Sequence, residues 1–159
     1  MNIRIIAVGK LKEKYLEMGI NEYLKRLQTY AKVEIVEVKE ESFSEPLSEK
    51  SSQQILEREG KRILDAIPEK YYVIALDRLG KQQTSEELSN ILQELAVYGQ
   101  GNIALIIGGS LGLSSAVLEK ADLKLSFSKF TFPHQLMRLI LVEQIYRALT
   151  IIRGEKYHK

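Results

Sequence analysis

The side chains best suited to acid–base chemistry lie at the two ends of the last long apolar segment. The only two histidines are His134, where this segment begins, and His158, next to the C-terminus. Arg153 and Tyr157 accompany the second histidine, and together these groups could contact phosphate, stack on a base and exchange a proton. A frayed tail is the alternative for Arg153, Tyr157 and His158, because chain ends are often disordered.

His134 directly follows Pro133, and proline fits the first turn of a helix because its missing N–H costs nothing there. The positive end of that helix disfavours a charged imidazolium. A neutral His134 could orient a substrate or accept a proton. A hydrogen-bonded packing residue would fit the same pattern.

A glycine-rich run, Gly108-Gly109-Ser110-Leu111-Gly112, comes directly after the most apolar predicted strand. Glycines let the backbone approach a ligand closely, and ligands of open α/β sheets bind beyond the carboxyl ends of strands. The run lacks the Gly-Lys-Ser/Thr of a P-loop and the full dinucleotide spacing. A tight strand-to-helix turn without a ligand is the alternative.

A second loop, Ser126 to Phe132, alternates small hydroxyl and aromatic residues. Such a segment could supply backbone donors and apolar walls to a ring such as adenine. An amphipathic edge strand that places Phe127, Phe130 or Phe132 in the core is the alternative.

Composition limits the chemistry of the chain. A length of 159 residues predicts one domain over residues 1–159, and 45% hydrophobic with 28% charged residues is ordinary for a globular protein. The absence of cysteine excludes disulfides, thiolate metal sites and a cysteine nucleophile, and two separated histidines argue against a metal site. The N-terminal apolar run is too short for a signal peptide or a membrane span, so we expect a cytoplasmic protein.

Charge is unevenly distributed along the chain. The net charge of +2 is too small to indicate nucleic-acid binding. The C-terminal segment nevertheless holds more cations than its two acids, Glu143 and Glu155. Its basic residues are Lys124, Lys129, Arg138, Arg147, Arg153, Lys156 and Lys159. A surface that contacts phosphate would have this bias, as would a solvated surface with chance clustering. The opening GKLKEKY also offers lysines near a strand end, where they could touch RNA phosphate.

Strand and helix patterns alternate along the chain. Apolar or alternating runs predict strands over residues 3–8, 33–38, 71–76, 103–107 and 124–127. Helical spacing or end signals predict helices over about 12–30, 51–67, 85–98 and 114–121, and a long one after Pro133. Residues 39–50 read as an exposed loop and Asp77 to Gly80 as a turn. This order predicts an α/β fold with a mostly parallel sheet.

The last helix is apolar on more than one face, whereas the surface helix of a monomer needs only one apolar stripe. The helix is therefore expected either at the centre of the core or also in a subunit interface. Glu143 and Arg147, four residues apart, read as an ordinary pair on the helix surface.

Four stretches, IIGGSLGL, LSFSKFTFPHQLMR, LVEQIYRA and RGEKYHK, closely resemble the RlmH family. These are small bacterial methyltransferases of the SPOUT class that act on a pseudouridine in large-subunit ribosomal RNA. The resemblance covers the whole chain, including the opening IIAVGKLKEKYLEMGINEY. Phe130 stands where methionine is frequent and keeps the loop hydrophobic. Lys156 stands where proline is usual and bears on how stiffly the tail is held.

The resemblance implies a SPOUT-type α/β sandwich with a C-terminal trefoil knot, which ordinary connection rules would not predict. It implies a homodimer with the active site near the interface. It also implies S-adenosyl-L-methionine as cofactor, no metal, and the assembled ribosome (23S rRNA) as substrate. The matching cofactor-binding positions are Leu76, Gly108, Phe127, Ser128, Lys129, Phe130, Thr131 and Phe132.

The implied reaction moves a methyl group to N3 of the pseudouridine, which carries an imide proton. His158, Tyr157 or His134 would orient the substrate and handle this proton, and Arg153 would hold phosphate or stabilise the base anion. One subunit's tail could join its partner's cofactor site. The alternatives are a related SPOUT methyltransferase that acts on tRNA, a non-catalytic ribosome-binding module, and a nucleotide-using metabolic enzyme, against which the missing phosphate motif counts.

Overall fold

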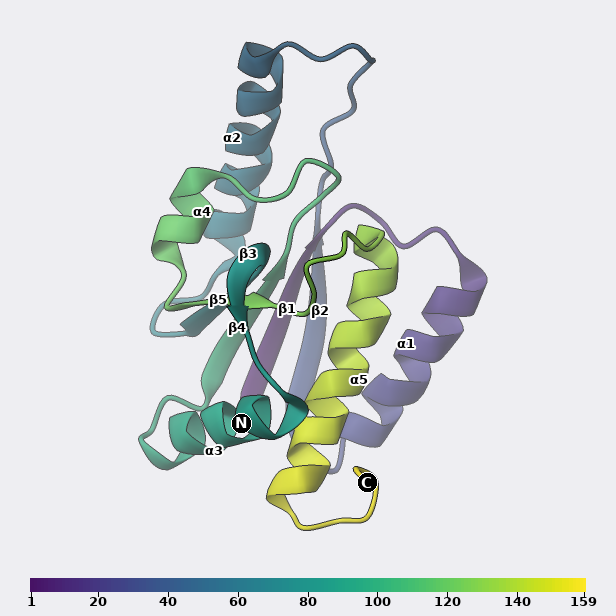
Figure 1. Ribbon diagram of the computed structural model, residues 1–159, viewed down its shortest axis with the longest axis vertical. Helices are drawn as coiled ribbons and strands as arrows, with labels where there is room; N and C mark the ends of the chain where they lie inside the picture. The colour runs from purple at the N-terminus through teal and green to yellow at the C-terminus, as the bar shows by residue number, and fades with distance from the viewer.

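A computed structural model describes all 159 residues, which form one five-stranded parallel sheet between two layers of helices (Figure 1). The strands are β1 (Asn2–Val8), β2 (Lys32–Val38), β3 (Tyr72–Gln82), β4 (Asn102–Ile107) and β5 (Leu123–Ser126). Their order across the sheet is β2-β1-β4-β3-β5, and every neighbouring pair is parallel. The predicted α/β class is therefore confirmed.

The central strands are buried because helices cover both faces of the sheet. Strands buried on both faces read as nearly continuous apolar runs, and β1 and β4 have this character. Ile5 of β1 is opposite Ile35 on one side and Leu105 on the other, and Ile5 and Leu105 are almost wholly buried.

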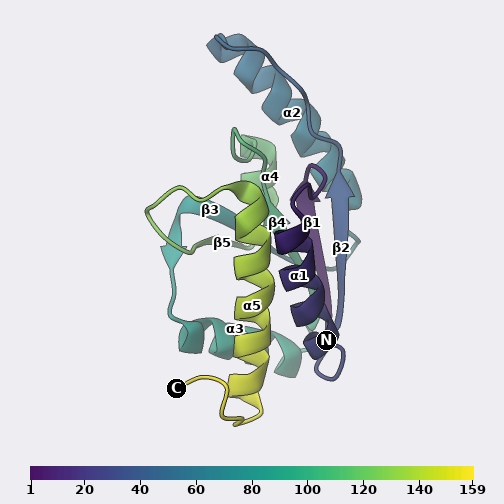
Figure 2. The ribbon, with the colours of Figure 1, turned by 90° about the vertical axis from the view of Figure 1, so that its right-hand side faces the viewer.

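Three helices cover one face: α1 (Lys14–Leu27), α3 (Ser85–Val97) and α5 (His134–Ile152). The other face is covered by α2 (Glu49–Ala66) and the short α4 (Ser115–Lys120). The larger core cluster lies on the α5 side. Figure 2 views the molecule from this side, with α1 and α5 in front of the strands. α5 packs against both α1 and α3, as expected for a helix that is apolar on several sides. No helix combines the length and the apolar character that a membrane crossing requires.

Side-chain caps mark where several helices begin. Thr84 accepts a hydrogen bond from Glu87 N at 3.1 Å, and the Glu87 carboxylate accepts one from Thr84 N at 2.7 Å. This capping box starts α3, and Thr84 is its N-cap. Pro133 likewise is the residue before α5, with ψ of 131°, and the helix begins at His134.

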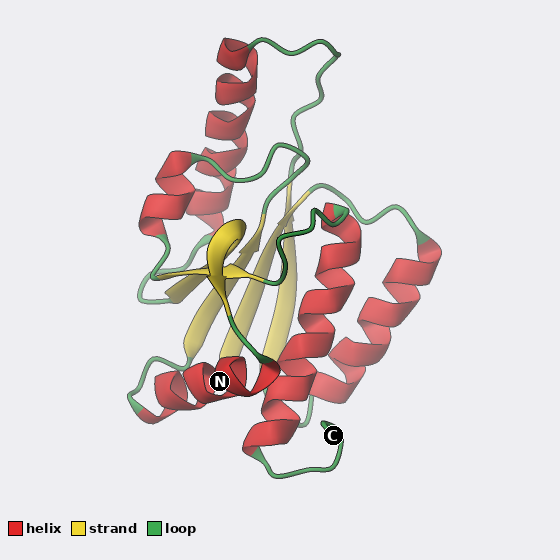
Figure 3. Ribbon diagram, in the orientation of Figure 1, coloured by secondary structure: helices red, strands yellow, loops and turns green.

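The predicted turn from Asp77 to Gly80 is wrong. β3 continues through these residues as a bulge, because its pairing with β5 shifts register between Leu76 and Lys81, both of which are opposite Leu125. A Cβ on Gly80 would lie 2.6 Å from the Lys124 carbonyl oxygen. The bulge therefore brings two backbones into close contact, which glycine permits. Figure 3 shows β3 drawn as a strand that curls over its course.

Candidate active site

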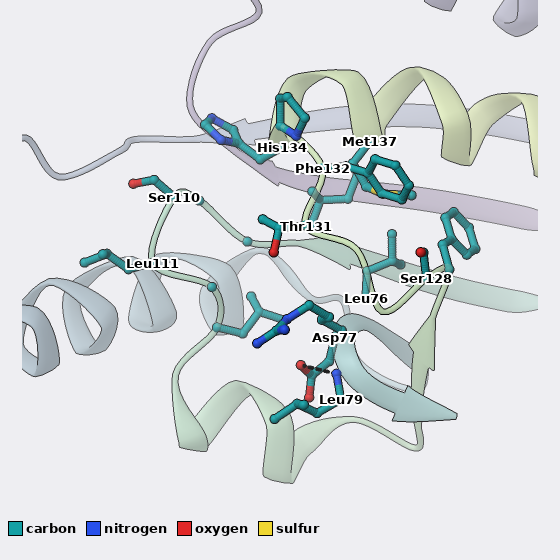
Figure 4. A pocket seen from close by; sticks show the side chains of 18 of the residues that line it. Leu76, Asp77, Leu79, Ser110, Leu111, Ser128, Thr131, Phe132, His134 and Met137 are labelled. Carbon is teal, nitrogen blue, oxygen red and sulfur yellow. Dashed lines mark hydrogen bonds between the residues drawn. The ribbon is translucent and has the colours of Figure 1, made fainter. Parts of the chain in front are cut away.

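A cavity of about 830 Å³ opens beside the bulge of β3 and at the carboxyl ends of β4 and β5 (Figure 4). Three segments far apart in the sequence form its wall: residues 76–79, residues 107–113 and the loop that leads from β5 into α5. Its size lies within the usual range of small-molecule sites, about 300–1,000 Å³. Both loops that the sequence singled out therefore meet at one site, at the sheet edge where ligands of open α/β folds bind.

The glycine loop after β4 is a tight turn that leaves the cavity open. Gly112 N donates a hydrogen bond to Gly109 O at 3.1 Å, and Gly112 has a φ of +86°. A Cβ on Gly108 would lie 2.5 Å from Gly112 O, with backbone on that side and no room to yield. Position 108 is buried and requires glycine, and the backbone of the turn from Gly108 to Gly112 lines the cavity.

Hydroxyl groups of the segment itself hold the second loop. Ser126 donates to Ser128 O at 3.0 Å, and the Ser128 hydroxyl accepts from Phe130 N at 3.0 Å. Phe127 packs against the core, whereas Phe130 is 80% exposed and Phe132 is 37% exposed. The edge-strand alternative is wrong, because β5 ends at Ser126 and residues 127–132 form a loop beside the cavity. Only the expected core contact of Phe127 is present.

Most of the predicted site residues line this cavity, but the tail residues do not. The lining includes Leu76, Gly108, Phe127, Ser128, Phe130, Thr131, Phe132 and His134. Lys129 is exposed and does not line the cavity, and Arg153, Tyr157 and His158 lie elsewhere.

His134 is the one predicted acid–base residue at the cavity of its own chain. Figure 4 shows it where α5 begins. Its Nε2 atom is buried and has no hydrogen-bond partner. Buried polar atoms are nearly always paired, so an unpaired nitrogen at a cavity wall is suited to a ligand.

The C-terminal tail is folded back against the middle of α5, so the frayed-tail alternative is wrong. The Tyr157 hydroxyl donates to Glu143 at 3.0 Å and accepts from the Tyr23 hydroxyl at 3.3 Å, and the Tyr157 ring meets Tyr146 edge-on. Burial, together with the hydrogen bonds to Tyr23 and Glu143, raises the pKa of Tyr157 well above its ordinary value. Tyr157 is therefore held as a neutral phenol.

His158 is held between a cation and a carboxylate. Its Nδ1 lies 3.2 Å from Arg147 Nη1, and its Nε2 lies 2.8 Å from Glu86 Oε1. A guanidinium only donates, so Nδ1 accepts and Nε2 carries the hydrogen that is donated to Glu86. The hydrogen bond from His158 lowers the pKa of Glu86.

Glu143 and Arg147 form the predicted pair on α5, and they also bind the C-terminal tail. Their side chains are 18% and 25% exposed, and they form an ion pair of 2.5 Å. Glu143 also accepts from Tyr157, and Arg147 donates to His158. The pair therefore anchors the tail.

The tail and the cavity are separate within one chain. Glu143 follows His134 by two and a half helical turns, which is about 14 Å along α5. The tail bends back to Glu143 and Arg147 but no further toward the cavity. One chain therefore does not bring Arg153, Tyr157 and His158 together with His134.

Two polar residues of the cavity wall were missed from the sequence. Asp77 and Arg78 belong to the β3 bulge and line the cavity, and Asp77 accepts a hydrogen bond from Leu79 N at 3.2 Å. Their position directly after a buried strand was the available signal, because that is where such sheets bind ligands.

The basic surface predicted for the C-terminal segment is smaller than its sequence suggested. Arg138 is 2% exposed, donates to Glu37 at 2.6 Å and donates to Gly9 O at 3.2 Å. Arg147 is paired with Glu143. Neither arginine is free to contact phosphate.

The sequence of the chain places it among the SPOUT methyltransferases. A family model described as a predicted SPOUT methyltransferase matches residues 1–158. A solved structure titled as a probable methyltransferase from Bordetella pertussis Tohama I shares the fold, with a TM-score of 0.57 at 15% identity, over 93% of this chain and 96% of that one.

Relatives of high sequence identity identify one family within the SPOUT methyltransferases. Proteins named ribosomal RNA large subunit methyltransferase H from Bacillus pumilus and Alkaliphilus oremlandii are 58% and 60% identical to this chain. Both matches cover the full length of each chain. The chain belongs to this family, the RlmH family.

Proposed function

We propose that this protein is an S-adenosyl-L-methionine-dependent methyltransferase that modifies N3 of a pseudouridine in 23S ribosomal RNA. Its substrate is the assembled ribosome in the cytoplasm. The observation that carries the proposal is the cavity formed by the glycine loop and the 127–132 loop, in a chain whose full-length relatives are named for ribosomal RNA methylation.

The residues of the cavity fit the proposed cofactor. Leu76, Ile107 and Leu125 provide apolar surface for an adenine ring, and the backbone of the glycine turn lines the same cavity. The unpaired Nε2 of His134 offers a polar contact at the wall. When bound, the cofactor supplies a methyl group on a sulfonium, and its leaving group is neutral.

The protein must then position the base and manage the imide proton of N3. We assign this proton to His134, because its ring belongs to the cavity wall and its buried Nε2 has no partner to displace when the ring turns toward the base. Tyr157 suits orientation and not proton removal, because its raised pKa opposes the phenolate. His158 must first release Arg147 if its Nδ1 is to act as a base.

The tail residues serve the site through a homodimer in this proposal. Leu136, Leu139 and Ile140 remain partly exposed on α5, and Tyr15 and Met18 of α1 are 69% and 73% exposed. Pairing of two chains over this apolar surface would place the Arg153, Tyr157 and His158 of one chain near its partner's cavity. We also propose that the trefoil knot implied by the resemblance lies where the two cavity loops meet.

Methyl transfer from isotopically labelled S-adenosyl-L-methionine tests the function. Unmethylated ribosomes, free 23S rRNA and tRNA are incubated with the protein, and nucleosides are mapped by mass spectrometry. The proposal expects label on a pseudouridine N3, with assembled ribosomes as the best substrate. If only tRNA is labelled, tRNA and not ribosomal RNA is the substrate. Ribosome binding without cofactor binding would make the protein a non-catalytic module.

A further inference from the structure

Three lysines project from the connection between β1 and α1 and from the first residue of α1. Lys10, Lys12 and Lys14 are all exposed, and none of them forms an ion pair. Glu13 and Glu17 are their acidic neighbours in sequence, and neither pairs with a lysine. The protein carries a net charge of only +2, so these lysines are not part of a general positive surface. The carboxylates from other elements near them are Glu37, which Arg138 pairs, and Glu40 beside Gly9.

The backbone of this segment is fixed by two distant elements. Leu11 N donates to Glu37 of β2 at 2.8 Å, and Lys12 N donates to Gln135 of α5 at 3.0 Å. Glu37 is itself held by the buried Arg138, which also donates to Gly9 O. The lysines therefore project from a preorganised backbone, which lowers the entropy lost when they bind a partner.

Helix stability does not explain these lysines. Lys12 and Lys14 lie at the N-terminal end of α1, where the helix dipole disfavours positive charge. The residue before the helix, Glu13, makes no side-chain cap. Positive charge at this place therefore costs some stability and points to an external anion.

The segment lies beside the cavity. Its contact residue Gln135 follows His134 directly, and Figure 1 shows the β1–α1 connection passing the N-terminal end of α5. The exposed Lys129 comes from the loop that forms another part of the cavity rim. Cations thus lie next to the place where the methylated base would enter.

We infer that Lys10, Lys12 and Lys14 bind backbone phosphates of the ribosomal RNA that flank the target base. This inference rests on the proposed function, which supplies the polyanion. Lysine–phosphate contacts carry no sequence information but set the register of the strand, so the cavity can receive one particular base. The arrangement answers how a protein with a small net charge holds RNA.

A charge-matched comparison tests the inference. One variant carries K10Q, K12Q and K14Q. The control carries K32Q, K61Q and K70Q, which replace three exposed lysines outside the cavity wall. Lys32 begins β2, Lys61 lies on α2, and Lys70 precedes β3, so Lys32 and Lys70 are at the N-terminal ends of their strands. Both lose the same charge. Affinity for unmethylated ribosomes is measured between about 50 and 200 mM KCl, and calorimetry with S-adenosyl-L-methionine verifies that each variant keeps its cavity.

The first variant should bind ribosomes at least about tenfold more weakly at low salt. Its plot of log affinity against log salt should be shallower by about 2, since each lost phosphate contact removes about 0.7 to 0.9 from the slope. The control should keep the wild-type slope. Cofactor affinity should be equal in all three proteins.

A wild-type slope in the first variant, or an equal change in the control, would overturn the inference. Binding of the same proteins to vesicles of anionic lipid is measured as well. If the first variant loses affinity for these vesicles but not for ribosomes, the inference is also overturned, and the lysines are assigned to a membrane surface. The proposed function is tested separately, by methyl transfer from labelled S-adenosyl-L-methionine with the wild-type protein. If wild-type protein labels no RNA but the slopes still differ as expected, the function fails and the RNA contact stands.

Discussion

The Tyr157 hydroxyl donates to Glu143 at 3.0 Å, and this contact holds the C-terminal tail against the middle of α5, away from the cavity of its own chain. The same carboxylate pairs with Arg147, which donates to His158. The predicted catalytic residues of the tail are therefore fixed in place by contacts with α5. The part of α5 between His134 and Glu143 separates them from His134.

Tyr157→Phe should lower the free energy of unfolding by about 1 kcal/mol, because it removes two hydrogen bonds of a partly buried hydroxyl. Urea denaturation measures the loss. Tyr98→Phe is the control, since Tyr98 is 80% exposed and its side chain makes no hydrogen bond, and it should leave stability unchanged. Equal midpoints for the two variants would show that the tail is not held by this contact.

Stability should fall at high pH through Tyr30. Its hydroxyl donates to Glu155 at 2.5 Å, and this hydrogen bond raises the pKa of Tyr30 to about 12. The unfolded chain loses this proton near pH 10, so stabilisation is complete below that pH and is lost between about pH 10 and 12. Tyr30→Phe should reduce the decline in unfolding free energy over this interval. An unchanged decline would contradict the assignment.

Arg138→Met should destabilise the protein strongly. The guanidinium is 2% exposed, and its loss leaves Gly9 O without its side-chain donor and Glu37 with Leu11 N but no cation. We expect a loss of about 3 kcal/mol, toward the low end for a broken buried pair because Glu37 remains 38% exposed. Arg26→Met removes an exposed pair with Glu22 and should change little. Similar thermal midpoints in the two variants would refute the buried role of Arg138.

Mixed dimers test whether the tail acts on the partner's cavity. One chain carries Gly108→Val, and the other ends before Tyr157; each alone should be inactive in methyl transfer. If the tail acts across the dimer, a mixed dimer has one intact site. An equal mixture should then regain roughly a quarter of wild-type activity, given random exchange of subunits. Continued inactivity, with exchange verified by mass spectrometry, would place the tail's action within one chain.

Local pattern predicted the order of strands and helices and both cavity loops. Apolar periodicity and glycine positions can be read from a few neighbouring residues. In a parallel sheet all strands have their carboxyl ends at the same edge, so loops that follow different strands lie at that edge together. The glycine loop after β4 and the loop after β5 are therefore found together as expected.

The failures depended on distant partners. Asp77 to Gly80 has the composition of a turn, and only pairing with β5 makes it a bulge. Arg138 seemed a surface cation because its partner Glu37 lies on β2, far away in the sequence. The docking of the tail likewise depends on Tyr23 and Glu86, which no local pattern connects to it.

Calorimetry with S-adenosyl-L-methionine on wild-type protein, Gly108→Ala and Gly101→Ala tests the proposed cavity most directly. A methyl on Gly108 meets the Gly112 backbone at 2.5 Å, whereas one on Gly101 has no atom nearer than 3.8 Å. We predict binding to wild-type and Gly101→Ala with equal affinity, and a loss of at least about tenfold in Gly108→Ala. Wild-type affinity in Gly108→Ala, or no binding to the wild-type protein, would contradict the placement of the methyl donor.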